Sequence, residues 1–128
     1  TKEILLLASQ SDLSLGVISN KHINFVNSFL EKSRINNFFD LIVGDNGEIV
    51  QKPNPTVFYS IIKPLFPELD NSQVLVVGDT AVDLQFAKNA QIDSCWAAYG
   101  YGDPTQCLAL KPNFVINEIT ELAALITN

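Results

Sequence analysis

The sequence predicts an α/β fold in which a mostly parallel β-sheet carries helices on both faces. Short continuous apolar runs, typical of buried strands, alternate along the chain with segments whose apolar residues recur at helical spacing. No internal repeat, low-complexity tract or long linker interrupts this alternation. Because right-handed crossovers are the common connection between parallel strands, the alternation favours a sheet of this kind. The length of 128 residues predicts a single domain, residues 1–128.

The first third of the chain predicts two helices and two strands. A helix over Lys2 to Gln10 precedes an apolar strand over Leu13 to Ser19, and a shorter strand is expected over Asp40 to Gly44. Between the strands lies a second helix, because four apolar residues share one helical face: Ile23, Val26, Phe29 and Leu30.

A third helix is predicted in the middle of the chain. Asn54 is a suitable cap, and Pro55 suits the first helical position, where its missing N–H costs nothing. We expect Pro64 and Pro67 to end the helix. One apolar face is formed by Phe58, Ile61, Ile62, Leu65 and Phe66.

The last third of the chain repeats the strand and helix alternation. Strands are expected over Val74 to Gly78, Cys95 to Tyr99 and, more weakly, Asn113 to Asn117. Helices are expected from about Ala81 to Ala90 and from about Glu118 to Ile126. The inward face of the last helix is predicted to comprise Ile119, Leu122, Ala123 and Ile126.

Composition excludes several classes of function. Fourteen acidic residues against eight basic ones give a net charge of −6, the wrong sign for holding a nucleic-acid backbone. The apolar runs are far shorter than the roughly 18 residues that cross a bilayer, and no signal peptide is evident, so a cytoplasmic protein without membrane partners is expected. Cys95, Cys107 and the single His22 are too few for a usual zinc site. We interpret both cysteines as small buried hydrophobes.

Three polar segments follow predicted strands or lie at the start of a helix: residues 16–21, 52–55 and 77–83. The carboxyl ends of parallel strands meet at one edge of a sheet, where ligands bind. Alone, each segment has an ordinary explanation. Ser19 and Asn20 suit a helix cap, Lys52 a solvated loop, and Asp83 the first turn of a helix.

Together these residue types suit the binding of a phosphate with a divalent cation. A hydroxyl and backbone N–H groups at a helix start hold phosphate oxygens, and a lysine supplies compact positive charge for phosphoryl transfer. Asp79 and Asp83 lie four residues apart across a strand-to-helix turn. Both carboxylates are therefore candidates for approaching Mg²⁺, which prefers oxygen ligands.

The three segments resemble motifs of the haloacid dehalogenase superfamily of phosphohydrolases, within its phosphoglycolate phosphatase-like branch. Gly16-Val-Ile-Ser-Asn-Lys21 is similar to the second motif, Lys52-Pro-Asn-Pro55 to the third, and Gly78-Asp-Thr-Ala-Val-Asp83 to the fourth. The resemblance covers almost the whole chain and extends to residues 89–92 and 99–102. Gln91 stands where that family commonly has glycine. A Rossmann-like core is the implied fold.

The resemblance assigns a role to each motif residue. It implies that Ser19, helped by Asn20, binds the transferring phosphate and that Lys52 neutralises it. Asp79 would ligate Mg²⁺ directly, with Asp83 as the second acidic residue of the metal site. The catalytic residues expected in this chain are thus Ser19 and Lys52.

The first motif of that family, an Asp-x-Asp sequence that supplies an aspartate nucleophile, is absent. No aspartate here has another two positions later; they lie at positions 12, 40, 45, 70, 79, 83, 93 and 103. The chain therefore resembles the carboxyl-terminal part of the catalytic core, without the central first strand and the helical cap. Its first residue, Thr1, adds to the expectation of a longer parent protein.

Without the central strand, two inner strand edges would be left without a neighbour. We expect a complementing amino-terminal segment, a partner chain or a homodimer to cover them. The leading hypothesis is a Mg²⁺-dependent phosphatase of a small phosphorylated metabolite, with phosphoglycolate as the first guess, inactive as an isolated chain. A non-catalytic phosphate-binding or interaction module is the alternative, and a receiver-like signalling domain ranks third.

Overall fold

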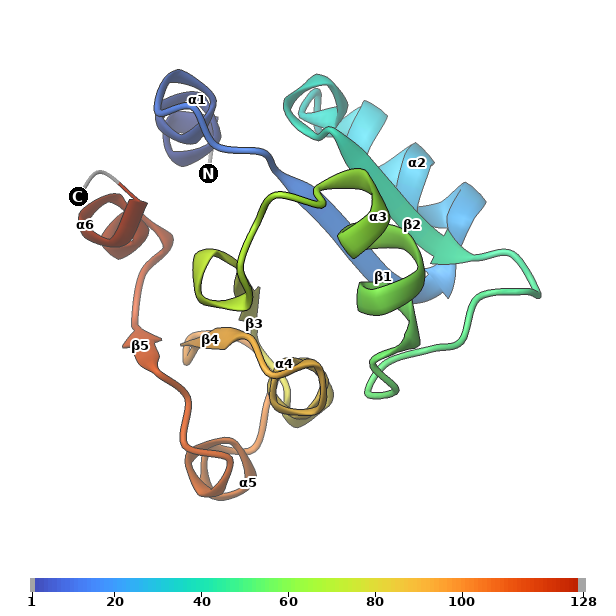
Figure 1. Ribbon diagram of the computed structural model, residues 1–128. Helices are drawn as coiled ribbons and strands as arrows, with labels where there is room; N and C mark the ends of the chain where they lie inside the picture. Colours follow the sequence, from blue (N-terminus) through green and yellow to red (C-terminus); the bar gives the residue numbers. More distant parts are fainter. Residues whose placement is uncertain (1, 127–128) are drawn as a thin grey trace. The chain divides into compact units, whose positions relative to one another are not determined.

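The computed structural model describes residues 2–126, which form an α/β fold with parallel strand pairs (Figure 1). The chain divides into two compact units, residues 1–49 with 119–128 and residues 50–118. The sequence-based expectation of a single domain over residues 1–128 stays a prediction.

The first unit contains a two-stranded parallel sheet flanked by helices. In chain order the elements of this unit are α1 (Lys2–Gln10), β1 (Gly16–His22), α2 (Ile23–Lys32), the short η1 (Asn36–Phe38), β2 (Leu41–Asp45), η4 (Ile119–Glu121) and α6 (Leu122–Ile126). β1 and β2 pair from Gly16 opposite Leu41 to Ile18 opposite Val43. The register then shifts, and His22 pairs with Asp45.

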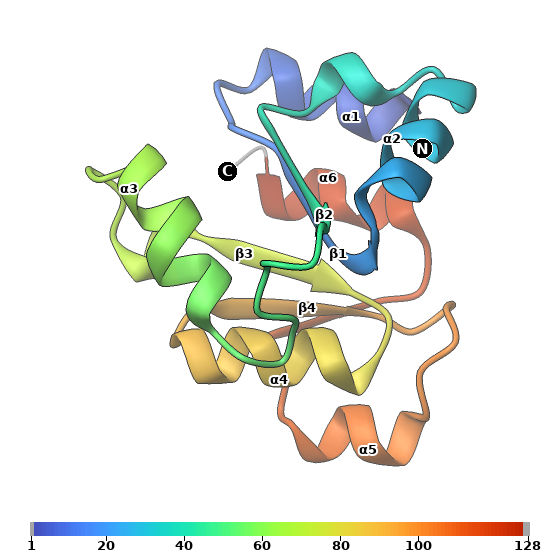
Figure 2. The same cartoon turned by 90° about the vertical axis from the view of Figure 1, so that its right-hand side faces the viewer.

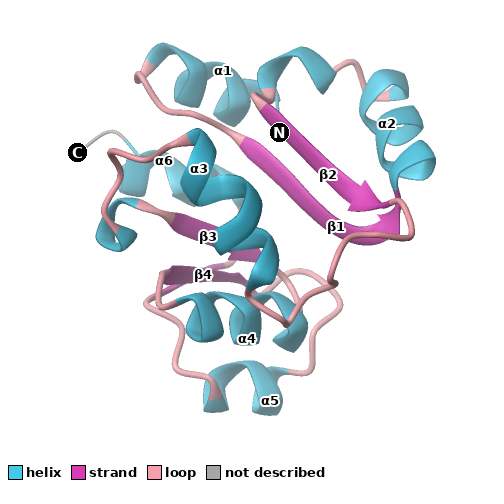
Figure 3. Cartoon of the chain, turned by 45° about the vertical axis from the view of Figure 1, so that its right-hand side comes forward, coloured by secondary structure: helices cyan, strands magenta, loops and turns pink. Residues whose placement is uncertain are grey.

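Apolar helix faces build the core of this unit. α2 contacts both β1 and β2 and buries Val26 and Leu30 (Figure 3). α1 contacts α6, and Ile4, Ala8 and Leu122 are buried. The helical spacing of these residues in the sequence is what places them on single faces.

Gly44 in β2 allows the turn from β1 into α2 to lie close to the sheet. A Cβ atom at this position would lie 2.7 Å from Ile23 Cα and 3.0 Å from Lys21 O, both backbone atoms. Backbone cannot move aside as a flexible side chain can, so only glycine fits. The close approach fixes where residues 19–22 leave the sheet.

The second unit contains a three-stranded parallel sheet in the order β3-β4-β5. Leu75 to Gly78 pair with Asp93 to Trp96, and Cys95 to Ala97 pair with Phe114 to Ile116. Its elements are the π-helical η2 (Phe58–Ile62), α3 (Lys63–Leu65), η3 (Asn71–Gln73), β3 (Leu75–Gly78), α4 (Ala81–Ala90), β4 (Asp93–Ala97), α5 (Pro104–Ala109) and β5 (Phe114–Ile116).

α4 runs along β3 and β4 and contacts both strands (Figure 2). Its carboxyl end is held by side chains: Tyr59 Oη donates to Ala90 O at 3.1 Å, and Asn71 Nδ2 donates to Ala90 O and Gln91 O, each at 3.3 Å. These bonds satisfy carbonyls that have no partner within the helix. The largest fully buried side chains are Phe58, Phe86, Leu84, Cys95 and Cys107.

Several predicted elements differ from the observed ones. Pro64 does not end the third helix, because a π turn precedes it, in which Lys63 N–H reaches back to Phe58 O, and the proline continues the path in α3. The last predicted helix is divided into the 3₁₀ turn η4 and α6. Most strands are displaced by one to three residues from the predicted ranges, and α5 was not predicted.

The predicted parallel sheet is divided in two among the described residues: β1 pairs with β2, whereas β3 belongs to the sheet with β4 and β5. β3 is therefore an end strand although all four of its residues are apolar or glycine, a composition typical of strands buried inside a sheet. Within residues 2–126, no helix combines the length and the apolar character needed to span a membrane.

Candidate functional site

The turn from β3 into α4 holds both acidic residues of the fourth motif. Asp79 follows the last residue of β3, Gly78, and Thr80 is the N-cap of α4. The Thr80 N–H donates to Asp83 Oδ2 at 3.4 Å and its hydroxyl to the same oxygen at 3.3 Å, half of a capping box. A Cβ on Gly78 would meet the Asp83 side chain, so glycine lets this carboxylate lie against the strand end.

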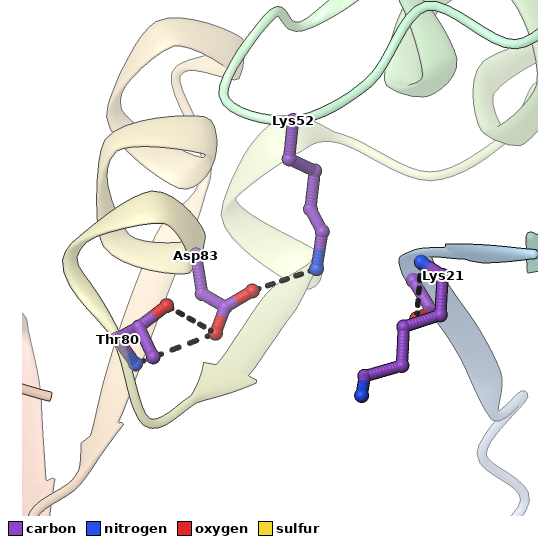
Figure 4. Close-up of polar contacts among 5 residues, drawn as sticks. Lys21, Lys52, Thr80 and Asp83 are labelled. Atoms are coloured by element: carbon purple, nitrogen blue, oxygen red, sulfur yellow. Dashed lines mark hydrogen bonds and ion pairs between the residues drawn. The ribbon is translucent and has the colours of Figure 1, made fainter. Parts of the chain in front are cut away.

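Lys52 forms an ion pair with Asp83 (Figure 4). Lys52 Nζ lies 2.7 Å from Asp83 Oδ1, and the two side chains are 12% and 15% exposed. The predicted solvated-loop role of Lys52 is thus incorrect, because its side chain turns onto the first turn of α4. At this burial, water screens the pair much less than a surface pair.

The loop that carries Lys52 is anchored to α4. Asn89 Nδ2 donates to Pro53 O at 2.8 Å, and the Lys52–Pro53 peptide bond is cis. The predicted cap residue Asn54 accepts a hydrogen bond from the Thr56 N–H at 3.0 Å. The loop and helix therefore hold Lys52 and Asp83 together from both sides.

Asp79 is held by one residue of β4 and one residue of the loop that follows it. The Tyr101 N–H donates to Asp79 Oδ2 at 3.1 Å, and Trp96 Nε1 donates to the Asp79 backbone oxygen at 3.3 Å. The other carboxylate oxygen, Oδ1, accepts no hydrogen bond from the residues that the structure describes. Through-space contacts of this kind have no sequence periodicity, so the sequence alone does not predict these roles of Trp96 and Tyr101.

Ser19 and Asn20 belong to the first unit, at the irregularity in β1 between Ile18 and His22. Bulges of this type redirect side chains and are frequent beside active sites. Ser19 Oγ accepts from the Lys21 N–H at 3.1 Å, and the cap of α2 is His22, whose Nδ1 accepts from the Asn24 N–H at 3.0 Å. The helix-cap alternative for Ser19 is therefore incorrect.

Lys52, Asp79 and Asp83 share the second unit, whereas Ser19 and Asn20 lie in the first. The structure thus brings the lysine and Asp83 into contact and places Asp79 at the same strand end. A joint phosphate site that includes Ser19 and Asn20 stays a prediction.

The acidic residues meet the modest requirement of Mg²⁺ for protein ligands. No group of three or more His, Cys, Asp or Glu residues suited to a metal occurs between residues 2 and 126. Mg²⁺ commonly uses only one or two carboxylates and completes its octahedron with water and substrate phosphate. Asp79 Oδ1 suits such a site, while both oxygens of Asp83 have contacts with Lys52 or Thr80.

Removal from water raises the pKa of two other side chains. Both cysteines are buried, as predicted, and burial raises the pKa of the Cys107 thiol. Desolvation likewise raises the pKa of Tyr99. After β2, the Gly47 N–H donates to Asp45 Oδ1 at 3.0 Å.

The family model of haloacid dehalogenase-like hydrolases matches residues 1–97. The chain belongs to the haloacid dehalogenase-like hydrolases. A phosphoglycolate phosphatase of Pectobacterium atrosepticum is 32% identical over 125 residues, which cover 98% of this chain and 53% of that protein. A phosphoglycolate phosphatase of Vibrio parahaemolyticus is 31% identical over 121 residues, 94% of this chain and 52% of that protein.

Solved structures agree with the fold of this hydrolase family. The crystal structure of a predicted phosphoglycolate phosphatase from Haemophilus somnus superposes with a TM-score of 0.88 at 26% identity, covering 97% of this chain and 54% of that one. The predicted Rossmann-like α/β class is thereby confirmed. The chain spans about half the length of the curated relatives that it matches.

Proposed function

We propose that this chain is the carboxyl-terminal part of the catalytic core of a Mg²⁺-dependent phosphatase acting on a small phosphate monoester. The observation that carries the proposal is the Lys52–Asp83 ion pair beside Asp79 at the end of β3. Phosphoglycolate is the first candidate substrate, because the relatives from Pectobacterium and Vibrio are phosphoglycolate phosphatases.

In this proposal, Lys52 neutralises the phosphate charge. Its ammonium group is positioned by Asp83 at 2.7 Å before any substrate arrives, so little reorganisation is needed during the reaction. The Ser19 hydroxyl and Asn20 bind the phosphate oxygens. Four of the five proposed site residues are charged or hydroxylic, a set that suits a phosphate monoester rather than an apolar ligand.

Asp79 would hold Mg²⁺ directly, and Asp83 is the second acidic residue of the metal site. The Tyr101 N–H engages Asp79 Oδ2 and leaves Oδ1 to face a cation. When bound, Mg²⁺ supplies positive charge that polarises the phosphoryl oxygens. The contacts of Asp83 with Lys52 and Thr80 favour a role in orienting these groups around the metal.

The nucleophilic aspartate would lie outside this chain, because no Asp-x-Asp sequence occurs in its 128 residues. The isolated chain is therefore proposed to be inactive until an amino-terminal segment or a second chain complements it. The apolar end strand β3 supports such a partner, since edge strands readily pair with another strand. We propose the cytoplasm as its location, and neither nucleic acid nor a membrane as a partner.

A complementation experiment tests this function. The chain is fused behind, or co-expressed with, the part of the Pectobacterium phosphatase that lies outside the matched region. Phosphate release from phosphoglycolate is then measured with and without Mg²⁺. We expect Mg²⁺-dependent hydrolysis from the complemented protein, at least about 100-fold slower hydrolysis after Lys52→Ala or Asp79→Asn, and none from the isolated chain.

A non-catalytic phosphate-binding or interaction module is the second candidate, favoured by the absent Asp-x-Asp sequence. The same experiment separates the two candidates. Phosphate binding without hydrolysis in every complemented form, despite correct folding, would favour the module and contradict the phosphatase.

A further inference from the structure

The end of β4 and the loop after it hold Asp79 at two separate points. The Tyr101 N–H donates to the carboxylate at Oδ2, and the Trp96 indole N–H donates to the backbone oxygen. Both donors come from residues 96–101, a short stretch of chain. The side chain and the backbone of Asp79 are therefore both tied to the same neighbouring segment.

Two glycines allow this segment to lie against Asp79. A Cβ on Gly100 would meet Asp79 Cβ and would lie 2.5 Å from Asp79 Oδ2. A Cβ on Gly102 would meet the Asp79 backbone oxygen and would lie 2.9 Å from Cys107 Sγ. Real Cβ atoms essentially never come within 3.0 Å of such neighbours.

Backbone conformation does not explain these glycines. Among the glycines that the structure describes, only Gly47 has a positive φ angle, so Gly100 and Gly102 do not adopt a conformation that requires glycine. What Gly100 and Gly102 share is close approach to one residue. Glycine therefore serves at both positions to let the loop reach Asp79.

We propose that Gly100, Gly102 and Trp96 are positioning residues that preset the Asp79 carboxylate for a divalent cation. The inference rests on the metal role proposed for Asp79 above. With Oδ2 bound to the Tyr101 N–H, the carboxylate meets a cation through Oδ1 in one fixed orientation. Mutation of the hydrogen-bonded partners that orient a metal ligand typically weakens metal binding by about 10–100-fold.

The chain carries its own reporter of this site. Trp96 is its single tryptophan, and the indole N–H bonds to Asp79. A cation bound at Asp79 is therefore expected to change the tryptophan fluorescence. Titration of the 128-residue protein with Mg²⁺, followed by fluorescence and by calorimetry, measures the dissociation constant. Asp79→Asn is expected to abolish the saturable signal.

Gly100→Ala is the decisive variant, and Gly16→Ala is its matched control. A Cβ on Gly16 meets Leu41 at 3.5–3.6 Å, an ordinary contact, so the same chemical change should leave Mg²⁺ affinity unaltered. Gly100→Ala should weaken Mg²⁺ binding by about 10–100-fold while far-ultraviolet circular dichroism stays native. If Gly100→Ala does not fold, Trp96→Phe removes only the indole donor and should weaken binding about tenfold by calorimetry.

The possible results separate this inference from the proposed function. Wild-type affinity in both Gly100→Ala and Trp96→Phe would overturn the positioning role and leave the proposed metal site standing. An equal loss in Gly16→Ala would also overturn it, because the effect would not be specific to the loop. Absence of Mg²⁺ binding by the wild-type protein would contradict the proposed metal site and the positioning role together.

Discussion

Removal of the charge on Asp83 is expected to destabilise the protein by about 2–3 kcal/mol. Exposed ion pairs contribute up to ~1 kcal/mol, whereas removing one partner of a buried pair costs about 3–5 kcal/mol. Lys52 and Asp83, at 12% and 15% exposure and 2.7 Å apart, lie near the buried case without full desolvation. Asp83→Asn is the appropriate change, because asparagine keeps an oxygen that accepts from Thr80.

A double-mutant cycle isolates the pair. Asp83→Asn, Lys52→Met and the combined variant are unfolded with urea and followed by circular dichroism. The combined variant should cost little more than either single one, which gives a coupling energy of about 2 kcal/mol. Lys88→Met is the control, because Lys88 is exposed in the last turn of α4, and it should cost less than ~1 kcal/mol. A coupling below about 0.5 kcal/mol would refute the assigned ion pair.

Three further predictions concern other positions. Gly44→Ala should lower stability by about 1–3 kcal/mol in thermal unfolding, because its Cβ would strike backbone of Ile23, and an unchanged midpoint would contradict the close approach. Gln91, with φ 60° and ψ 42° at the end of α4, is left-handed, so Gln91→Gly should stabilise by up to about 1 kcal/mol; a lower midpoint would oppose this. Burial raises the pKa of Cys107, so at pH 8 it holds less thiolate than an ordinary thiol, and peptide mapping should find slow alkylation until the protein unfolds.

The sequence predicts elements best where local signals agree with burial. The helices over Lys2–Gln10 and Ala81–Ala90 have the predicted bounds, and both bury apolar side chains. The π turn at Phe58–Ile62 was not predicted, since its hydrogen bonds differ from those of an α-helix while its apolar spacing looks alike. The observed bounds of the short strands differ from the predicted ones, because an apolar run does not mark the residue at which strand pairing begins.

Within the site, the sequence identifies residues but not their contacts. The fourth motif indicates Asp79 and Asp83, and a threonine three residues before an acidic residue is a known helix-start pattern. The Lys52–Asp83 pair joins positions 31 residues apart and required the folded chain. The unusual Gln91 also acquires a physical explanation, because its left-handed conformation is one that glycine adopts without strain.

The second unit contains the residues proposed to bind a cation, whereas the proposed catalysis also needs a nucleophile from outside the chain. Lys52, Asp79 and Asp83 all lie in residues 50–118, with their contacts to Thr80 and Tyr101 made inside the same unit. The cation binding proposed at Asp79 would thus use groups of this unit alone, whereas the proposed phosphoryl transfer would need a nucleophile from outside the given sequence. Mg²⁺ affinity should therefore respond to changes around Asp79 in the isolated chain, and hydrolysis should appear only after complementation. Metal binding that itself required the complementing segment would contradict this division.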